Sequence, residues 1–255
     1  MVSRKPVVSG VSEELLSLAR RDLAVYISLA HSTDMPDVND GMAIPSPVHE
    51  QIIDALMGET GHTLILAPRG AAKTTIVQAW LEWLLGRASC SKDTKWANRI
   101  RIIYISATAD QAYKISNAIK ETIEHNGVFQ ALFPKVKAHK TKWAEPSWKV
   151  QGNTIKDPNF IALGREGPVL GSRGDIVVLD DIVDAKVARS PTDQESTMFW
   201  LNNTVDKVVA DPRTSRYVMP CTRWYEGDPS QWAEERGWHK VLIQAIQKDE
   251  AGNES

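Results

Sequence analysis

The sequence has little cysteine and no hydrophobic run long enough to cross a membrane. Its two cysteines, Cys90 and Cys221, are far apart and have no partners at the spacing of a zinc site. The opening Met-Val-Ser-Arg-Lys lacks the apolar stretch of a signal peptide. These absences argue against a disulfide framework, a zinc site and a membrane partner, and they predict reduced thiols in a cytoplasmic setting.

A marked excess of charge of either sign is also missing. The 30 Lys and Arg residues nearly balance the 32 Asp and Glu residues, so the formal net charge is −2 and there is no basic coat for nucleic acid. One local run is basic and interleaved with aromatic residues: Lys135, Lys137, His139, Lys140, Lys142 and Lys149, with Phe133, Trp143 and Trp148. Its lysines could neutralise DNA phosphates without reading sequence, and a solvated basic loop or a subunit interface fits equally well.

Residues 67–75, APRGAAKTT, have the pattern of a phosphate-binding loop. They stand between the apolar run 63–66 and a helical pattern that begins at Ile76. In such a loop the backbone N–H groups and the helix N-terminus face a triphosphate. Glycine is usual where Ala67 and Ala72 stand, so the match to the common motif is imperfect. The residues predicted to bind ATP are Pro68, Arg69, Gly70, Ala71, Ala72, Lys73, Thr74 and Thr75.

Within this loop, Lys73 is expected to reach the outer phosphates and to be catalytic, while the Thr74 hydroxyl is expected to contact Mg²⁺. Gly70 can take a positive φ where the turn needs it. A chance Lys-Thr at a helix start is the alternative.

About a hundred residues later, the apolar run 176–179 ends in Asp180 and Asp181. Its β-branched bias predicts a buried parallel strand with carboxylates at the C-terminal tip, where α/β proteins bind ligands. Asp180 is then expected to hold Mg²⁺, mostly through water, and Asp181 to orient or deprotonate the attacking water. A strand that ends in a solvated acidic turn is the alternative. Together, and in this order, the loop and the carboxylates predict an ATPase.

The remaining pattern predicts an α/β fold, a phosphate-loop NTPase with a mostly parallel central sheet and helices on both faces. In chain order a strand at 102–105 comes between the two motifs, as in the additional-strand, catalytic-glutamate (ASCE) class. Residues 1–44 are expected to be an N-terminal helical extension and linker, and 45–255 the ATPase domain. Helices are predicted at 13–31, 49–57, 112–123 and 194–209, with further strands at 216–219 and 241–246, a turn-rich stretch at 32–47, and Trp80 and Trp83 in the core.

The segments PSPVHEQIIDAL, APRGAAKTT, YISATADQA, LGSRGDIVVLDDIVD and PCTRWYEGD, in this order, resemble the large terminase subunits of tailed bacteriophages. The resemblance covers most of residues 45–246 and implies the ATPase of a motor that pumps double-stranded DNA into a procapsid. It implies ATP and Mg²⁺ as cofactors and action in the host cytoplasm. Its implied partners are non-specific DNA, a portal protein, a small terminase subunit, and further copies in a ring on the procapsid, the chain alone being a monomer.

The chain ends right after the ATPase-like segments, so it resembles the motor domain alone, and the C-terminal nuclease domain of the family, with its activity, is expected to be absent. The family's usual Asp-Glu is Asp180-Asp181 here, which leaves open whether Asp181 or Asp184 positions the water.

The same resemblance gives roles to further residues. Thr222, in Pro-Cys-Thr-Arg after a predicted strand, matches the coupling motif that senses the γ-phosphate, and a strand-end cap is the alternative. His49 and Gln51 lie where the family contacts adenine, although such residues near a helix start also act as caps. Arg69 could contact phosphate charge in its own subunit.

Ring motors also need an arginine near the γ-phosphate, from the same or a neighbouring subunit. Arg165 and Arg173 lie just before the carboxylate strand, and Arg173 matches a conspicuous arginine of the family, so it is the first choice as a catalytic residue. A turn arginine paired with Asp175 is the structural alternative. Two other functions stay open: a DNA helicase or remodelling translocase, which would need a second motor domain, and a non-hydrolysing nucleotide switch, which would not need Asp181.

Overall fold

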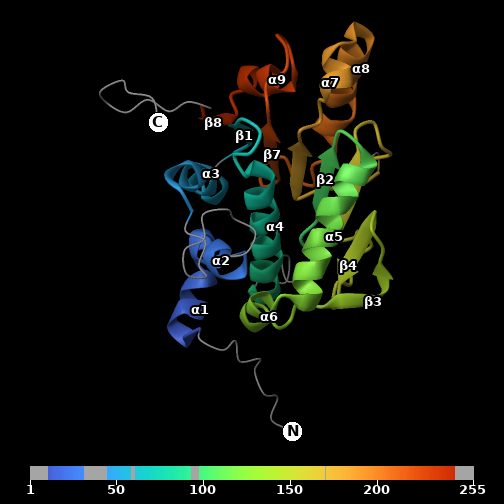
Figure 1. Ribbon diagram of the computed structural model, residues 1–255. Coiled ribbons are helices and arrows are strands. Elements are labelled where there is room, and N and C mark those ends of the chain that lie inside the picture. The colour runs from blue at the N-terminus through green and yellow to red at the C-terminus, as the bar shows by residue number, and fades with distance from the viewer. Residues whose placement is uncertain (1–10, 32–44, 59–60, 93–97, 170, 245–255) are drawn as a thin grey trace, which may run out of the picture.

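An eight-stranded sheet forms the centre of the computed structural model, which describes residues 11–31, 45–58, 61–92, 98–169 and 171–244 (Figure 1). The strand order is β3-β4-β5-β2-β6-β7-β1-β8. Neighbouring strands from β5 to β8 run parallel, whereas β3 and β4 form an antiparallel hairpin at one edge. The bounds are β1 Thr63–Leu66, β2 Ile102–Ser106, β3 Ala138–Trp143, β4 Ser147–Val150, β5 Phe160–Gly164, β6 Ile176–Asp180, β7 Arg216–Cys221 and β8 His239–Leu242.

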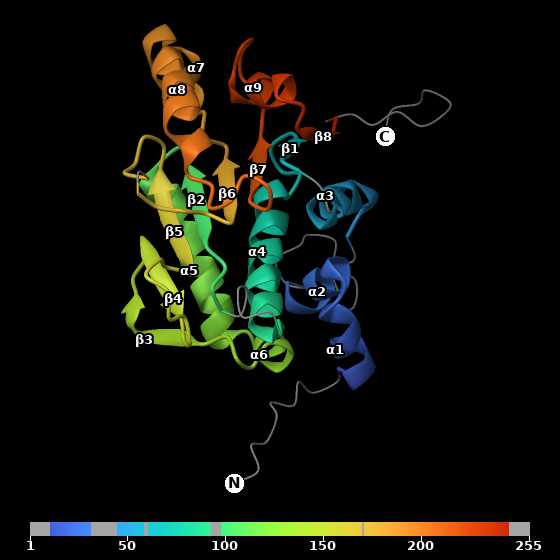
Figure 2. The same ribbon diagram turned by 180° about the vertical axis from the view of Figure 1, so that it is seen from behind.

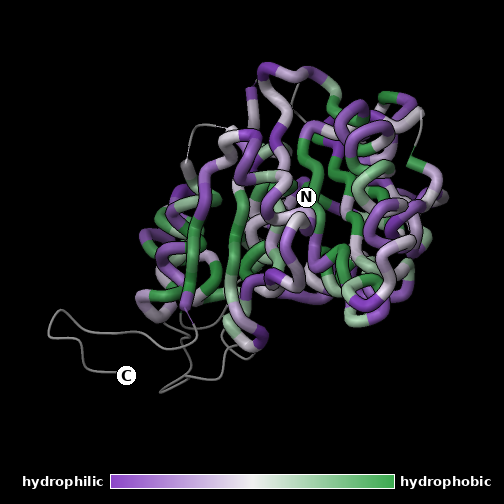
Figure 3. Tube along the Cα trace, turned by 90° about the horizontal axis from the view of Figure 1, so that it is seen from above, coloured by the Kyte–Doolittle hydropathy of each residue, from purple (hydrophilic) through white to green (hydrophobic). Residues whose placement is uncertain are grey.

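The central strands are buried on both faces, because alternate side chains enter two different hydrophobic clusters. Ile102 and Tyr104 of β2 pack into one cluster, and Ile103 and Ile105 into the other. Figure 3 shows the hydrophobic segments inside and the hydrophilic segments toward the outside. This arrangement explains why these strands read as continuous apolar runs.

Helices cover both faces of the sheet, as predicted (Figure 2). One face carries α1 Glu13–Ala19, α2 Leu23–Ala30, α3 Pro47–Met57, α4 Lys73–Cys90, α5 Ala109–His125 and α6 Gly127–Leu132. The other carries α8 Pro191–Asn203, the 3₁₀ helix η1 Val205–Lys207 and α9 Pro229–Glu235, with the short α7 Ala185–Ala188 before them. Among the described residues, no helix is both long enough and apolar enough to span a membrane.

The strand that separates the phosphate-loop strand from the carboxylate strand in space is β7. It pairs with β1 on one side and with β6 on the other. By contrast β2, which lies between the two motifs in the chain, is on the far side of β6. The additional-strand arrangement is therefore present, and the inserted strand comes after both motifs in sequence.

The predicted single helix over 13–31 is wrong, because the segment forms two helices. The chain turns after α1, and the Asp22 side chain caps α2 by accepting from Val25 N at 3.2 Å. Both helices dock on α4: Trp83 Nε1 donates to Ala19 O at 3.0 Å, and Tyr26 OH donates to the fully buried Glu82 at 2.8 Å. Trp80 and Trp83 are each 2% exposed, so their prediction as core residues is confirmed.

Three further expectations change or fall outside the described residues. The helix predicted over 194–209 ends at Asn203 and is followed by η1. From His139 onward the basic run lies in the hairpin of β3 and β4 rather than in a loop, and β5 was not predicted. Residues 1–10 and 32–44, within the predicted extension and linker, and 245–255, including the end of the strand predicted over 241–246, lie outside the described residues.

Candidate phosphate-binding and catalytic site

The C-terminal ends of three neighbouring strands bring the predicted site together. β1 leads into the loop at 67–72, β6 ends in Asp180 followed by Asp181, and β7 leads into Thr222. Because these strands are parallel and adjacent, their C-terminal ends meet at one end of the sheet. Residues more than 140 positions apart in the chain thus lie within hydrogen-bonding distance.

The loop turns tightly before α4 begins at Lys73. Gly70 has φ of +87°, a conformation that glycine takes without a Cβ clash. Ala72 caps the helix with φ of +51° and ψ of +17°, in the left-handed region where an alanine is strained. This backbone explains why glycine is the usual residue at position 72. The guanidinium of Arg69 lies 5.2 Å from the centre of the Trp224 ring, and its side chain is exposed rather than directed into the loop.

Lys73 is only 5% exposed and joins the other groups of the site. Its Nζ lies 3.2 Å from Asp181 Oδ2 and donates to Thr222 Oγ1 at 3.3 Å. The Thr222 hydroxyl in turn donates to Ala67 O at 3.1 Å, and so links the end of β7 to the start of the loop. Thr222 is therefore more than a strand-end cap, because it contacts the loop lysine directly.

Asp180 is buried beside two hydroxyl groups. Thr74 Oγ1 lies 3.1 Å from Asp180 Oδ1, and Tyr104 OH donates to Asp180 Oδ2 at 2.5 Å. Burial raises the pKa of Asp180 from 3.8 to about 6, although the bonds from Tyr104 and Thr74 and the nearby Lys73 charge oppose the rise. Tyr104 was not among the residues predicted for the site, because it lies mid-strand in β2 and its contact depends on the pairing of β2 with β6.

The pair Asp180 and Thr74 fits Mg²⁺. Both supply the hard oxygen ligands that this cation prefers, and Mg²⁺ usually takes one or two protein ligands and completes its shell with water and phosphate. Among the described residues there is no cluster of three or more His, Cys, Asp or Glu that would hold a metal by itself. The Asp180 carboxylate and the Thr74 hydroxyl therefore suit a cation that binds together with a nucleotide.

Asp181 and Asp184 have different surroundings. Asp181 has φ of +41°, and its Oδ1 accepts from Thr222 N at 3.0 Å while its other oxygen faces Lys73. Asp184 instead caps α7, accepting from Lys186 N and Val187 N, each at 3.0 Å. In the described part of the chain, Asp181 is thus the one of the two that contacts the groups of the site.

The two residues predicted to contact adenine, His49 and Gln51, lie near the start of α3. His49 Nδ1 accepts from Ser46 N at 3.2 Å in a capping box, and Gln51 lines a groove beside β8. A separate pocket of about 250 Å³ borders the loop directly, and it was not predicted because β8 supplies part of its wall. Its lining is Leu66, Ala67, Pro68, Thr222, Arg223, Leu242 and Ile243. A larger cavity of about 510 Å³ lies at the other end of α4 and contains none of the site groups.

The two candidate arginines lie at opposite ends of the parallel strands. Arg165 directly follows β5 at the end of the sheet that carries the phosphate loop; its Nη1 donates to Thr197 Oγ1 at 2.9 Å, and its buried Nε has no partner among the described residues. Arg173 is exposed and precedes β6, where its Nη1 donates to Lys207 O at 2.8 Å. Arg173 therefore lies at the end of the strands away from the phosphate loop of its own chain.

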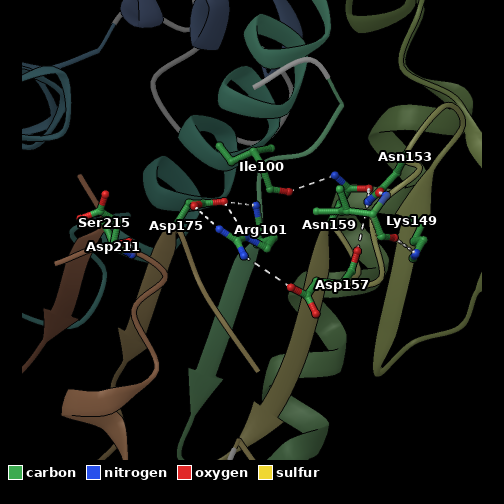
Figure 4. Close-up of polar contacts among 10 residues, drawn as sticks. Ile100, Arg101, Lys149, Asn153, Asp157, Asn159, Asp175, Asp211 and Ser215 are labelled. Atoms are coloured by element: carbon green, nitrogen blue, oxygen red, sulfur yellow. Dashed lines mark hydrogen bonds and ion pairs between the residues drawn. The ribbon is translucent and has the colours of Figure 1, made fainter. Parts of the chain in front are cut away.

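The alternative that paired Arg173 with Asp175 is also wrong. Figure 4 shows Asp175 bound by Arg101, with Nη2 to Oδ1 at 2.8 Å and Nε to Oδ2 at 3.0 Å. Arg101 reaches Asp157 as well, so this polar network joins the starts of β2, β5 and β6. It leaves the Arg173 side chain at the surface.

Comparisons with known proteins bear on the fold. No family model and no curated protein matches the sequence. Among solved structures, the large terminase of bacteriophage HK97 is similar over 88% of this chain, with a TM-score of 0.51 and 15% sequence identity. The chain spans 43% of the length of that protein. The predicted terminase-like α/β architecture is thus confirmed as a likeness of fold.

Proposed function

We propose that this chain hydrolyses ATP with Mg²⁺ to drive double-stranded DNA into a viral procapsid. The observation that carries the hydrolase part is the contact of Lys73 with both Asp181 and Thr222, beside the Thr74–Asp180 pair. A lysine, two carboxylates and two hydroxyls at one helix N-terminus match the needs of phosphoryl transfer, which relies on positioning and charge stabilisation.

Each residue of the site has its own task. The backbone N–H groups of residues 69–75 and the Lys73 side chain would hold the β- and γ-phosphates, and Thr74 and Asp180 would hold Mg²⁺, which would supply positive charge beside the phosphates. Asp181 orients the attacking water and accepts its proton. Thr222 contacts Lys73 and the loop carbonyl of Ala67, so a change at the γ-phosphate can be passed to β7. The mostly apolar pocket next to the loop is the proposed place for the adenine ring of ATP.

The DNA-packaging part is supported by the fold shared with the HK97 large terminase. This part of the proposal includes double-stranded DNA, a portal protein, a small terminase subunit and further copies in a ring as partners, and action in the host cytoplasm. The alternative function, a helicase or remodelling translocase, can be distinguished from it by what stimulates ATP hydrolysis. A packaging motor should hydrolyse ATP slowly as an isolated monomer and faster with procapsid, portal and DNA, whereas a helicase should respond to DNA alone and unwind it.

The positions of the two arginines support a proposal that they act in different subunits. Arg173, exposed at the far end of the strands, is proposed to act on the nucleotide of a neighbouring copy, and Arg165 on its own. If Arg173 acts across the boundary, mixing Arg173→Ala with Asp181→Asn subunits in an assembled motor restores some turnover, because one interface then holds two intact partners. Unchanged turnover by Arg173→Ala alone would remove it from the mechanism.

The test of the hydrolase proposal is Lys73→Ala, with Lys114→Ala as the matched control. Lys114 is an exposed lysine on α5, so its loss changes the charge equally outside the site. Lys73→Ala should lose ATP turnover and bind a fluorescent ATP analogue weakly, with an unchanged circular dichroism spectrum. Normal hydrolysis by a folded Lys73→Ala protein would overturn the nucleotide proposal.

The choice between the two candidate bases is tested by Asp181→Asn and Asp184→Asn. Asparagine still caps a helix, so Asp184→Asn removes charge while keeping α7. We expect Asp181→Asn to bind nucleotide but to slow turnover about 100-fold or more, the scale of general acid–base catalysis. The reverse pattern, with Asp184→Asn inactive and Asp181→Asn active, would make Asp184 the base.

A further inference from the structure

The hairpin of β3 and β4 closes the sheet at the edge opposite to β8 (Figures 1 and 2). Its inner side is fixed by aromatic packing: Trp148 is fully buried and stacks on Phe160 of β5, with centroids 5.0 Å apart and planes within 2°. Trp143 packs on Trp148 at 5.0 Å. The hairpin is therefore a rigid element, and its outer side is what remains for contact with a partner.

Four lysines, which we call the hairpin lysines, lie on the hairpin or on the segment that leads into it: Lys135 and Lys137 precede β3, and Lys140 and Lys142 lie within it. All four side chains are exposed, and none has a hydrogen bond or ion pair with any described residue. The nearby acid, Glu145 at the hairpin turn, is held by Asn117 at 2.9 Å. A positive patch of this kind stands out on a chain with a formal charge of −2.

The spacing of Lys140 and Lys142 suits a phosphate backbone. Alternate residues of a strand are about 6.6 Å apart, which is close to twice the ~3.4 Å axial rise per phosphate along one DNA strand. Lys137 precedes β3, while Lys140 and Lys142 are alternate residues within it. Lys140 and Lys142, at this spacing, can reach every second phosphate of one strand without reading bases.

We infer that the hairpin lysines form a contact surface for the phosphate backbone of duplex DNA. This inference rests on the proposed function for its choice of polyanion. The rigid aromatic attachment of the hairpin to β5 and β2 holds the surface in a fixed place relative to the nucleotide site, which a DNA-moving enzyme needs. Such lysines also protect an edge strand from pairing with other chains, and the experiment separates these two roles.

The experiment uses the full chain and a fluorescein-labelled 30-base-pair duplex, with binding followed by anisotropy between 50 and 200 mM NaCl. Four phosphate contacts give a slope of log K against log salt of about −3.6, which is about a 150-fold loss of affinity over this range. Lys140→Gln/Lys142→Gln should reduce the slope to about −1.8 and weaken binding about 60-fold at 100 mM salt. The control, Lys186→Gln/Lys207→Gln, makes the same charge change on α7 and η1 and should bind like the unaltered protein.

Several outcomes would overturn the inference. One is an unchanged slope for the hairpin variant; another is an equal change in the control, which would show a general charge effect. If the hairpin variant keeps its DNA affinity but loses solubility, the lysines protect the edge strand. If it keeps its DNA affinity but no longer self-associates, they belong to a subunit interface. Binding of a fluorescent ATP analogue, measured in parallel, keeps the two proposals apart. If nucleotide binds and duplex DNA does not, only the hairpin inference fails; if nucleotide does not bind, the proposed function fails.

Discussion

Replacing Asp180 by asparagine should stabilise the nucleotide-free protein while destroying its use of Mg²⁺. Asp180 is 6% exposed, and burial raises its pKa from 3.8 to about 6. The charged form is therefore less favourable in the folded chain than in the unfolded chain. A shift of about two units corresponds to about 3 kcal/mol, since one unit is 1.36 kcal/mol.

The sign of the pH dependence comes from proton binding. Because the folded state holds the proton more tightly, the stabilisation from protonated Asp180 is present below the unfolded pKa, near pH 4, and is lost as pH rises through about 6. The unaltered protein should lose up to about 3 kcal/mol between these values relative to Asp180→Asn, which has no proton to release. Tyr104 can still donate to the side-chain oxygen of asparagine.

The assay is urea unfolding of both proteins in EDTA at half-unit steps from pH 4 to pH 8. Asp110→Asn, at an exposed position of α5, is the control for removing a carboxylate. The difference in unfolding free energy between Asp180→Asn and the unaltered protein should grow with pH and level off above pH 7. A difference that is constant over this range would refute the link between burial and charge at Asp180.

Three further outcomes are expected. Tyr104→Phe removes the donor to Asp180 and should raise the Mg²⁺ concentration for half-maximal binding of an ATP analogue about 10-fold, as for other groups that orient a metal ligand; unchanged Mg²⁺ dependence would remove Tyr104 from this role. Glu82→Ala, measured by urea unfolding, should cost about 3–5 kcal/mol, because the buried carboxylate bonds Tyr26, His31, Gln78 and Thr122; a cost under about 1 kcal/mol would contradict the network. Ala72→Gly relieves a left-handed alanine and should keep turnover and melting temperature, whereas Ala72→Val should lower the melting temperature; a marked loss with glycine would contradict the strain at Ala72.

The sequence by itself determined the parts of the site that are contiguous in the chain. The loop at 67–75 and the carboxylates at the end of β6 come directly after apolar runs, and a short apolar run between breakers is typical of a buried strand in such a sheet. Because parallel strands deliver the next residues of the chain to the same end of the sheet, Lys73 and Asp180 could be placed together from the chain alone. Thr222 was instead identified by the resemblance of its Pro-Cys-Thr-Arg segment to the coupling motif of the terminase family.

Tertiary structure decided everything that depends on which strands are neighbours. The pairing of β2 with β6 brings Tyr104 to Asp180, and the place of β7 brings Thr222 to Lys73. It also separated Arg173 from Arg165, since positions close together in the chain can lie at opposite ends of the strands when a loop runs back along the sheet. The periodicity of a sequence predicts whether a segment is a helix or a strand, but not which strand it pairs with. These contacts therefore could not be predicted from the sequence.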